Sequence, residues 1–293
     1  MREHRPEGLP EQVELTQVPF FPQEENWCGP AALAMVLNAN GIGISEPAVA
    51  EQVYLPGRKG SLQVEMLAAA RRNGLVAYRL APRLEDVLRE VAAGNPVIAL
   101  ENYGFDWYPL WHYSVVIGYD LADLEIVRRS GLKARQPQPF AVFEYVWKKD
   151  QHWAMVALPP QRLAATADEH GYATAIAALE QAGQTRAAHT AYETMLARWP
   201  QNLIARIGYG NTAYALGDKV AAEKAFRAAA EAHPDSAAAF NNLAQTLADR
   251  GEYEPAMTAA QKAVDLGGPL ADAARSTLEE IKRKLGGLGA SSR

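Results

Sequence analysis

Hydrophobic and polar positions follow different patterns in the two halves of the chain. In the first half, residues 31–37 are apolar on nearly every side, which predicts a buried helix that starts near Cys28 and ends at Gly41. Residues 61–74, with Ser61 as the expected N-cap, and residues 84–94 have helical spacing. Strand-like runs follow at residues 95–103, 112–120, 124–131 and 152–160, while residues 140–147 fit either a helix or a strand. Helices followed by strands predict an α+β domain with an antiparallel sheet.

The second half is helical throughout and repeats itself. Gly183, Gly217 and Gly251 are separated by 34 residues each time. The same register relates three further sets of residues: Ala188, Ala222 and Ala256; Tyr192 and Phe226; and Pro200 and Pro234. A period of 34 residues, built from a helix, a glycine turn, a helix and a proline, is typical of tetratricopeptide repeats. We therefore predict an all-α solenoid of three repeats, closed by a charged capping helix.

These two patterns predict the organisation of the chain. We expect an N-terminal tail at 1–16, an α+β domain at 17–160, a linker at 161–168, repeats with their capping helix at 169–286, and a tail at 287–293.

Composition excludes several classes of function. The chain of 293 residues is 48% hydrophobic and has a formal charge of −5, without any lysine- or arginine-rich run, so we expect no nucleic acid partner. One cysteine excludes an internal disulfide, and no histidine or carboxylate cluster has metal-ligand spacing, so no cofactor or metal is expected. The sequence shows no apolar run long enough for a transmembrane segment and no secretory signal at its start, although a signal could have been removed from a precursor.

Cys28 is the first candidate for chemistry. A lone cysteine usually packs as a small hydrophobe, but this one stands at the N-terminus of the predicted buried helix. The unpaired amide groups and the helix dipole at that position favour a thiolate, which is the nucleophilic form of cysteine. The local sequence therefore predicts a nucleophile.

A thiol nucleophile requires a base, and the first half offers two histidines for that role. His112 opens the strand at 112–120, just after an aromatic loop that contains Trp107, Tyr108 and Trp111. His152 follows a charged run and is the weaker alternative, because we expect it at the surface.

The run VPFFPQEENWCGPAALAMVL, followed later by HYSVVIGYD, resembles the C39-like cysteine peptidases, a papain-type family that includes peptidases of bacteriocin leaders. The resemblance covers residues 17–160 and implies a papain-like fold with Cys28 as nucleophile and His112 as base. It also implies that Gln23 completes an oxyanion hole with the Cys28 amide. The family usually has an Asp-Pro pair on the next strand to orient the imidazole, whereas this chain has Ser130 and no Asp-Pro there. Ser130 could orient the ring as a neutral acceptor.

The sequence leaves three functions open. The first is a cysteine peptidase whose repeats recruit a protein substrate or partner. The second is a peptide-binding adaptor with little or no catalysis, because the orienting carboxylate is missing. The third is an amidase or acyltransferase that uses the same thioester chemistry. The pairing of such a domain with repeats also resembles a bacterial family that includes lipoproteins, which implies a periplasmic or lipid-anchored location if a signal was removed.

Overall fold

The computed structural model describes residues 8–23, 26–105 and 107–290. The chain forms two compact units, which meet in sequence at Gln184 and Thr185.

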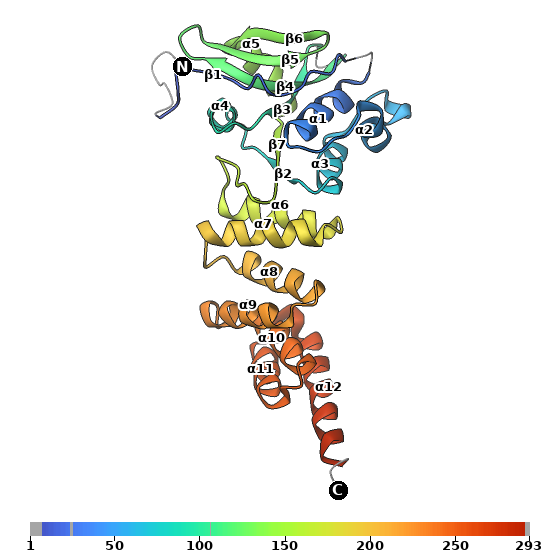
Figure 1. The fold of residues 1–293 in the computed structure, drawn as a ribbon, viewed down its shortest axis with the longest axis vertical. Coiled ribbons are helices and arrows are strands. Elements are labelled where there is room, and N and C mark those ends of the chain that lie inside the picture. Colours follow the sequence, from blue (N-terminus) through green and yellow to red (C-terminus); the bar gives the residue numbers. More distant parts are fainter. Residues whose placement is uncertain (1–7, 24–25, 106, 291–293) are drawn as a thin grey trace. The chain divides into compact units, whose positions relative to one another are not determined.

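The first unit contains an antiparallel sheet (Figure 1). Its described strands are β1 (Gln12–Glu14), β2 (Val76–Arg79), β3 (Val97–Asn102), β4 (Trp111–Asp120), β5 (Glu125–Ser130), β6 (Lys133–Pro139) and β7 (Ala154–Leu158). The order is β2-β7-β3-β4-β5-β6, and β1 pairs with the C-terminal part of β4 beyond the end of β3. This register places Glu101 of β3 directly opposite His112 of β4.

Helices pack against this sheet or, in the case of the second one, against its neighbouring helices. They are α1 (Cys28–Ala39), α2 (Glu46–Val53), α3 (Gln63–Arg72), α4 (Leu84–Ala92) and α5 (Phe140–Trp147), with short 3₁₀ turns η1 (Pro56–Arg58) and η2 (Lys148–Asp150). In Figure 1, α1, α2 and α3 lie on one side of the central strands and α4 lies on the other. Residues 29–37 of α1 are all buried, as their apolar sequence predicts, so α1 is the central helix of this unit.

The predicted fold class is confirmed, and the local differences have physical reasons. Residues 140–147 form a helix rather than a strand. Helix α3 begins at Gln63, so the predicted cap at Ser61 is wrong: the N-cap is Leu62, and no side chain caps the helix. The sequence patterns missed β1, β2 and β6, because β1 and β2 are short and β6 is a polar edge strand with two prolines.

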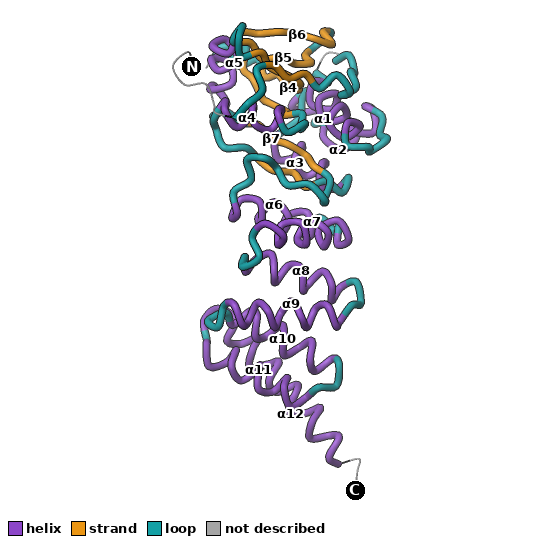
Figure 2. The backbone as a smooth tube through the Cα atoms, turned by 60° about the vertical axis from the view of Figure 1, so that its left-hand side comes forward, coloured by secondary structure: helices purple, strands orange, loops and turns teal. Residues whose placement is uncertain are grey.

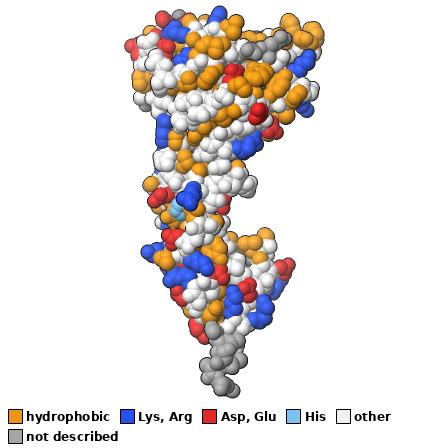
Figure 3. Space-filling view, turned by 45° about the vertical axis from the view of Figure 1, so that its right-hand side comes forward, with side chains coloured by type: hydrophobic (Ala, Val, Ile, Leu, Met, Phe, Trp, Pro, Cys, Tyr) orange, Lys and Arg blue, Asp and Glu red, His pale blue; other side chains and the backbone are white. Residues whose placement is uncertain are grey.

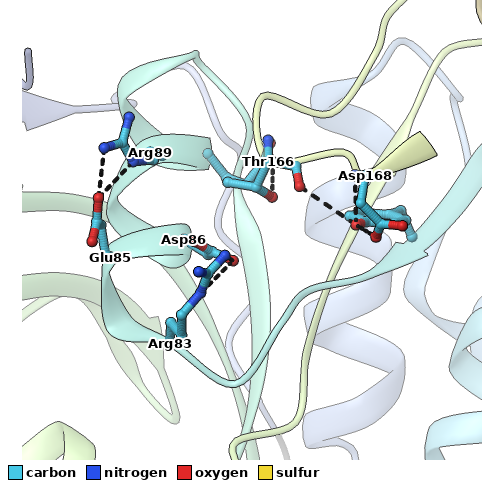
Figure 4. A network of polar contacts seen from close by, with 8 residues as sticks. Arg83, Glu85, Asp86, Arg89, Thr166 and Asp168 are labelled. Carbon is cyan, nitrogen blue, oxygen red and sulfur yellow. Dashed lines mark hydrogen bonds and ion pairs between the residues drawn. The ribbon is translucent and has the colours of Figure 1, made fainter. Parts of the chain in front are cut away.

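Residues 159–168 connect β7 to the next helix, α6 (Glu169–Gln181). Polar contacts hold this connection against α4 and β2 (Figure 4). Glu90 of α4 is fully buried, and its carboxylate accepts hydrogen bonds from both the amide and the hydroxyl of Thr166, at 2.7 and 2.6 Å. Tyr78 of β2 donates to Asp168 at 2.8 Å, and its ring lies 5.4 Å from the ring of Tyr172. Helix α6 therefore packs on β2, the edge strand of the sheet.

The second unit is helical (Figure 2). Its helices are α7 (Thr185–Arg198), α8 (Leu203–Ala215), α9 (Lys219–Ala232), α10 (Ala237–Asp249), α11 (Tyr253–Leu266) and α12 (Ala271–Ala290), with a 3₁₀ turn η3 (Gly268–Leu270) before the last helix. Each helix packs against the next one in the chain. Ala188, Ala222 and Ala256, which the repeat register aligns, are fully buried.

The aromatic residues of the repeat register pack on glycines of α8. A Cβ atom added at Gly208 would lie 2.1 Å from the ring of Tyr192, and one added at Gly210 would lie 2.5 Å from the ring of Phe226. Since both rings are nearly fully buried, the interior of this unit depends on the absence of side chains at these two positions.

Candidate active site

The first unit contains a cavity of about 830 Å³ that three of the candidate residues share. Cys28 enters it from the start of α1, His112 from the start of β4, and Gln23 from the segment that precedes α1. Ser130 lies next to it, and Gly131, which follows Ser130, lines the cavity wall. Residues that are far apart in the sequence are therefore brought to one place by the pairing of β4 with β5 and by the packing of α1 on β4.

The thiol of Cys28 is half-buried and surrounded by amide groups. Burial raises its pKa above the ordinary value of 9.0, and hydrogen bonds from the backbone amides of Tyr113, Gly29 and Cys28 itself oppose that rise without cancelling it. The amides of Gly29 and Cys28 at the start of α1 therefore favour the thiolate, as the sequence predicts. The desolvation of the sulfur, which the sequence does not reveal, outweighs them, so the net direction of the pKa is upward.

The imidazole of His112 is held by the next strand. Its Nε2 atom lies 2.8 Å from the Oγ atom of Ser130, and its ring lies 6.0 Å from the ring of Tyr103. Burial, and to a smaller extent the positive charge of Arg128, lower the pKa of His112 to about 4. The ring is thus neutral near pH 7, and in the tautomer with the proton on Nε2, that atom donates to Ser130 and leaves Nδ1 as an acceptor.

Gln23 is buried and forms hydrogen bonds with β4 and with the turn after β5. Its side-chain Oε1 atom accepts a hydrogen bond from the Gly131 amide at 2.7 Å, and its backbone amide donates to the Gly131 carbonyl at 3.0 Å. Its Nε2 group donates to the carbonyl of Tyr113 at 3.3 Å. One side chain therefore connects the segment before α1 with β4 and with the turn after Ser130.

A buried ion pair lies behind the imidazole. Arg128 of β5 and Glu101 of β3 are almost completely inaccessible, and the guanidinium approaches the carboxylate to 2.7 Å. Glu101 also accepts hydrogen bonds from Ser114 and Tyr103. Sequence inspection missed this network because charged residues within strand-like runs suggest exposed positions, whereas both strands are central to the sheet.

The remaining candidates lie elsewhere. The ring of His152 packs on Trp147 at 4.7 Å and is absent from the described residues that line the cavity. Leu110 and Trp111 of the aromatic loop do line it, whereas Trp107 is 81% exposed and stacks on Phe105. Hydrophobic side chains also reach the surface elsewhere in the first unit, on the face shown in Figure 3.

In the described part of the chain, no group of three or more histidine, cysteine, aspartate or glutamate residues could hold a metal ion. No helix there is long and apolar enough to cross a membrane.

A thiol at the start of a central helix and an imidazole on an antiparallel sheet, facing one cavity, define the architecture of a papain-like cysteine peptidase. Residues 15–155 match the model of the Peptidase_C39 like family, and residues 179–239 and 210–271 match two tetratricopeptide repeat models. The chain therefore carries a C39-like peptidase domain followed by tetratricopeptide repeats, which confirms the resemblance inferred from the sequence.

Parts of the chain are similar to solved structures of two proteins. A Bacillus anthracis protein assigned as a C39-like peptidase shares 21% identity, with a TM-score of 0.43, over 51% of this chain and 98% of its own. The type III secretion translocator chaperone SycD of Yersinia enterocolitica shares 21% identity, with a TM-score of 0.37, over 38% of this chain and 81% of its own. The same chaperone in complex with a peptide of the translocator YopD shares 20% identity, with a TM-score of 0.36, over 38% of this chain and 90% of its own. The comparison with curated proteins gave no match.

Proposed function

We propose that the protein is a cysteine peptidase that hydrolyses a peptide bond through a thioester formed on Cys28. The observation that carries the proposal is that Cys28, His112 and Gln23 line one cavity, in which the imidazole is hydrogen-bonded to Ser130 through Nε2. With the ring proton on Nε2, Nδ1 is the atom that accepts the thiol proton. Cys28 and His112 supply the nucleophile and the base that thioester chemistry needs.

Each residue has one role in the reaction. The Sγ atom of Cys28 attacks the substrate carbonyl carbon while Nδ1 of His112 accepts the thiol proton and then gives it to the leaving amine. The negative charge that develops on the carbonyl oxygen is stabilised by the Gln23 Nε2 group and the Cys28 amide. Water, deprotonated by the same imidazole, then hydrolyses the thioester. Ser130 keeps the ring oriented as a positioning residue.

The pKa directions determine how the attack begins. Because the pKa of Cys28 is raised and that of His112 is lowered to about 4, the resting pair is a neutral thiol and a neutral imidazole. The proton must therefore move during the attack rather than before it. The imidazolium that forms is disfavoured by the charge of Arg128 and has a hydroxyl, not a carboxylate, at Ser130. This arrangement supports slow turnover compared with a triad that contains aspartate.

The same observation favours one alternative, a peptide-binding adaptor that keeps the cleft and lacks catalysis. In both functions the tetratricopeptide repeats recruit a protein, which is the substrate in the first case and a partner to be held in the second. Repeat arrays of this kind present extended surfaces to other proteins.

Alkylation and hydrolysis separate the two functions. Cys28 is labelled with iodoacetamide at about pH 8, and mass spectrometry measures the rate of labelling. Cleavage of a mixed peptide library is measured in parallel. We expect the wild-type chain to be labelled about tenfold faster than the His112→Gln variant, and to cleave peptides that the Cys28→Ala variant leaves intact.

The His152→Gln variant is the matched control, because it removes the other histidine of the same domain that was considered as the base. It should behave as wild type in both assays. Equal, slow labelling of wild type and His112→Gln, without cleavage of any peptide, would support the adaptor instead. Recovery of peptides joined to an added amine would identify an acyltransferase.

A further inference from the structure

The cavity contains an acidic group that the proposed chemistry does not use. Asp150 ends the 3₁₀ turn η2, just before β7, and lines the same cavity as Cys28 and His112. Among the described residues of the cavity wall it is the only carboxylate. Its Oδ2 atom accepts a hydrogen bond from the side chain of Gln63 at 2.9 Å.

The backbone around Asp150 is fixed to the sheet. The Trp153 amide donates to the Asp150 carbonyl at 3.1 Å, and the Leu100 amide of β3 donates to the Trp153 carbonyl at 3.2 Å. Lys149, the preceding residue, donates to the Gly104 carbonyl at 2.8 Å. The carboxylate is therefore held in place before any ligand binds, and Leu100 adds an apolar wall to the same cavity.

Tyr113 interacts electrostatically with both Asp150 and the candidate nucleophile, Cys28. Burial raises the pKa of the Tyr113 phenol, and negative charges at Cys28 and at Asp150 raise it further. The phenol is thus within electrostatic range of both groups, and all three residues line the same cavity.

The charge of Asp150 is only partly compensated. Burial raises its pKa, whereas the Gln63 hydrogen bond and the more distant charge of Arg79 lower it by less. Arg58 and Lys59 also line the cavity, but they are exposed, and neither forms an ion pair with Asp150 in the described part of the protein. A cation that enters the cleft would therefore be attracted by a carboxylate that is held in place and whose charge is only partly compensated.

We propose that Asp150 determines specificity by binding the basic side chain of a lysine or arginine residue in the peptide that occupies the cleft. The charged end of that side chain pairs with the carboxylate, and its methylene groups lie along Leu100. This inference rests on the proposed function only in taking a peptide as the occupant of the cleft, since charge recognition does not require turnover.

Peptide binding to the full-length Cys28→Ala protein tests the inference without catalysis. The probes are six-residue peptide libraries in which each position in turn carries arginine or citrulline, which has the same shape without the charge. Bound peptides are quantified by mass spectrometry, and the best pair is measured by calorimetry. At one position, we expect arginine to bind about tenfold more tightly than citrulline, a difference of about 1.4 kcal/mol.

The Asp150→Asn substitution, made in the same Cys28→Ala background, keeps an acceptor for Gln63 and should reduce the preference to less than about twofold. The Asp123→Asn control, at an exposed turn between β4 and β5, should retain it. The inference is overturned if arginine and citrulline peptides bind equally, if the preference survives in Asp150→Asn, or if no peptide binds.

Hydrolysis by the wild-type protein, which keeps Cys28, is measured in a separate assay. Cleavage without a preference for basic residues would overturn the role of Asp150 and leave the peptidase intact. Charge-selective binding without cleavage would support Asp150 and identify an adaptor.

Discussion

The Nε2 atom of His112 lies 2.8 Å from the Oγ atom of Ser130, so a neutral hydroxyl orients the imidazole. The resemblance to C39-like peptidases places a carboxylate at this point of the strand. Without it, burial and Arg128 together set the pKa of the ring, and both lower it. The chemistry of the site therefore depends on how much the presence of Ser130, in place of a carboxylate, changes the pKa of His112.

Restoring the carboxylate should reverse the effect. In the Ser130→Asp variant we expect the pKa of His112 to rise by at least about 1 unit, because an anion beside Nε2 stabilises the imidazolium. The pKa is measured from the ring resonances by NMR. Ser130→Asn is the neutral control and should leave the pKa near its wild-type value; an equal pKa in the two variants would contradict the prediction.

The reactivity of Cys28 should depend on pH in a way that reports its raised pKa. Because burial keeps the sulfur protonated, the rate of alkylation should continue to rise as the pH increases past 9.0, the ordinary pKa of the thiol. Stopped-flow labelling across this range measures the profile. A rate that levels off below neutral pH would instead indicate a stable thiolate.

Acid should destabilise the protein through His112. The folded-state pKa of about 4 lies below the ordinary value of 6.5, so the unfolded chain binds more protons between these two values. The stabilising contribution is complete above pH 6.5 and is lost as the pH falls towards 4. Across this window, we expect the free energy of unfolding of wild type to decrease by about 3 kcal/mol more than that of His112→Gln.

Urea unfolding at both ends of the window measures the difference, and His152→Gln serves as the control that keeps His112. Equal losses in wild type and in His112→Gln would show that the ring is not held neutral by the fold.

The buried ion pair gives a prediction about stability. Replacing Arg128 alone, as in Arg128→Met, leaves Glu101 charged and unpaired and should cost about 3–5 kcal/mol in the free energy of unfolding. The double variant Glu101→Gln with Arg128→Met should recover part of this loss, because no buried charge remains. Urea unfolding provides the measurement.

The matched control is Arg135→Met, which removes the partly exposed pair between Arg135 and Glu14. This change should cost less than about 1 kcal/mol. A loss as large as that of Arg128→Met would show that burial of the pair is not what matters.

Truncation tests where the first unit ends. A chain that ends at Gln184 keeps α6 on β2 and should unfold cooperatively near the temperature of the peptidase domain in the full chain. A chain that ends at Pro160 removes the Thr166 donors of Glu90 and uncovers β2, so it should be less stable and prone to associate. Circular dichroism and size-exclusion chromatography compare the two, and equal stability would contradict the prediction.

The sequence predicts the fold well where its signals are local or periodic. The apolar run after Cys28 predicted the central helix, and the 34-residue spacing of Gly183, Gly217 and Gly251 predicted turns where all three residues have a positive φ. Strands β3, β4, β5 and β7 were predicted from their composition. Strand β6 was not, because a polar edge strand has no hydrophobic alternation to detect.

The site was predictable only in part, because its chemistry depends on distant partners. Cys28 and His112 were selected as site residues from their positions in the sequence, and Gln23 and Ser130 from the resemblance to C39-like peptidases; the catalytic roles of all four stay predictions. The carboxylate of Asp150 and the pair between Glu101 and Arg128 were missed, since only the pairing of strands reveals that they lie at the cleft or behind His112. The raised pKa of Cys28 was missed as well, because the degree of desolvation cannot be deduced from a helix N-terminus alone.

The protonated sulfur of Cys28 also affects how the protein withstands oxidants. Peroxides react with thiolates rather than with thiols, so a sulfur that burial keeps protonated is oxidised slowly. The chain has no second cysteine that could convert a sulfenic acid into an internal disulfide. Its protection against oxidative inactivation therefore comes from slow reaction at the sulfur and not from repair within the molecule.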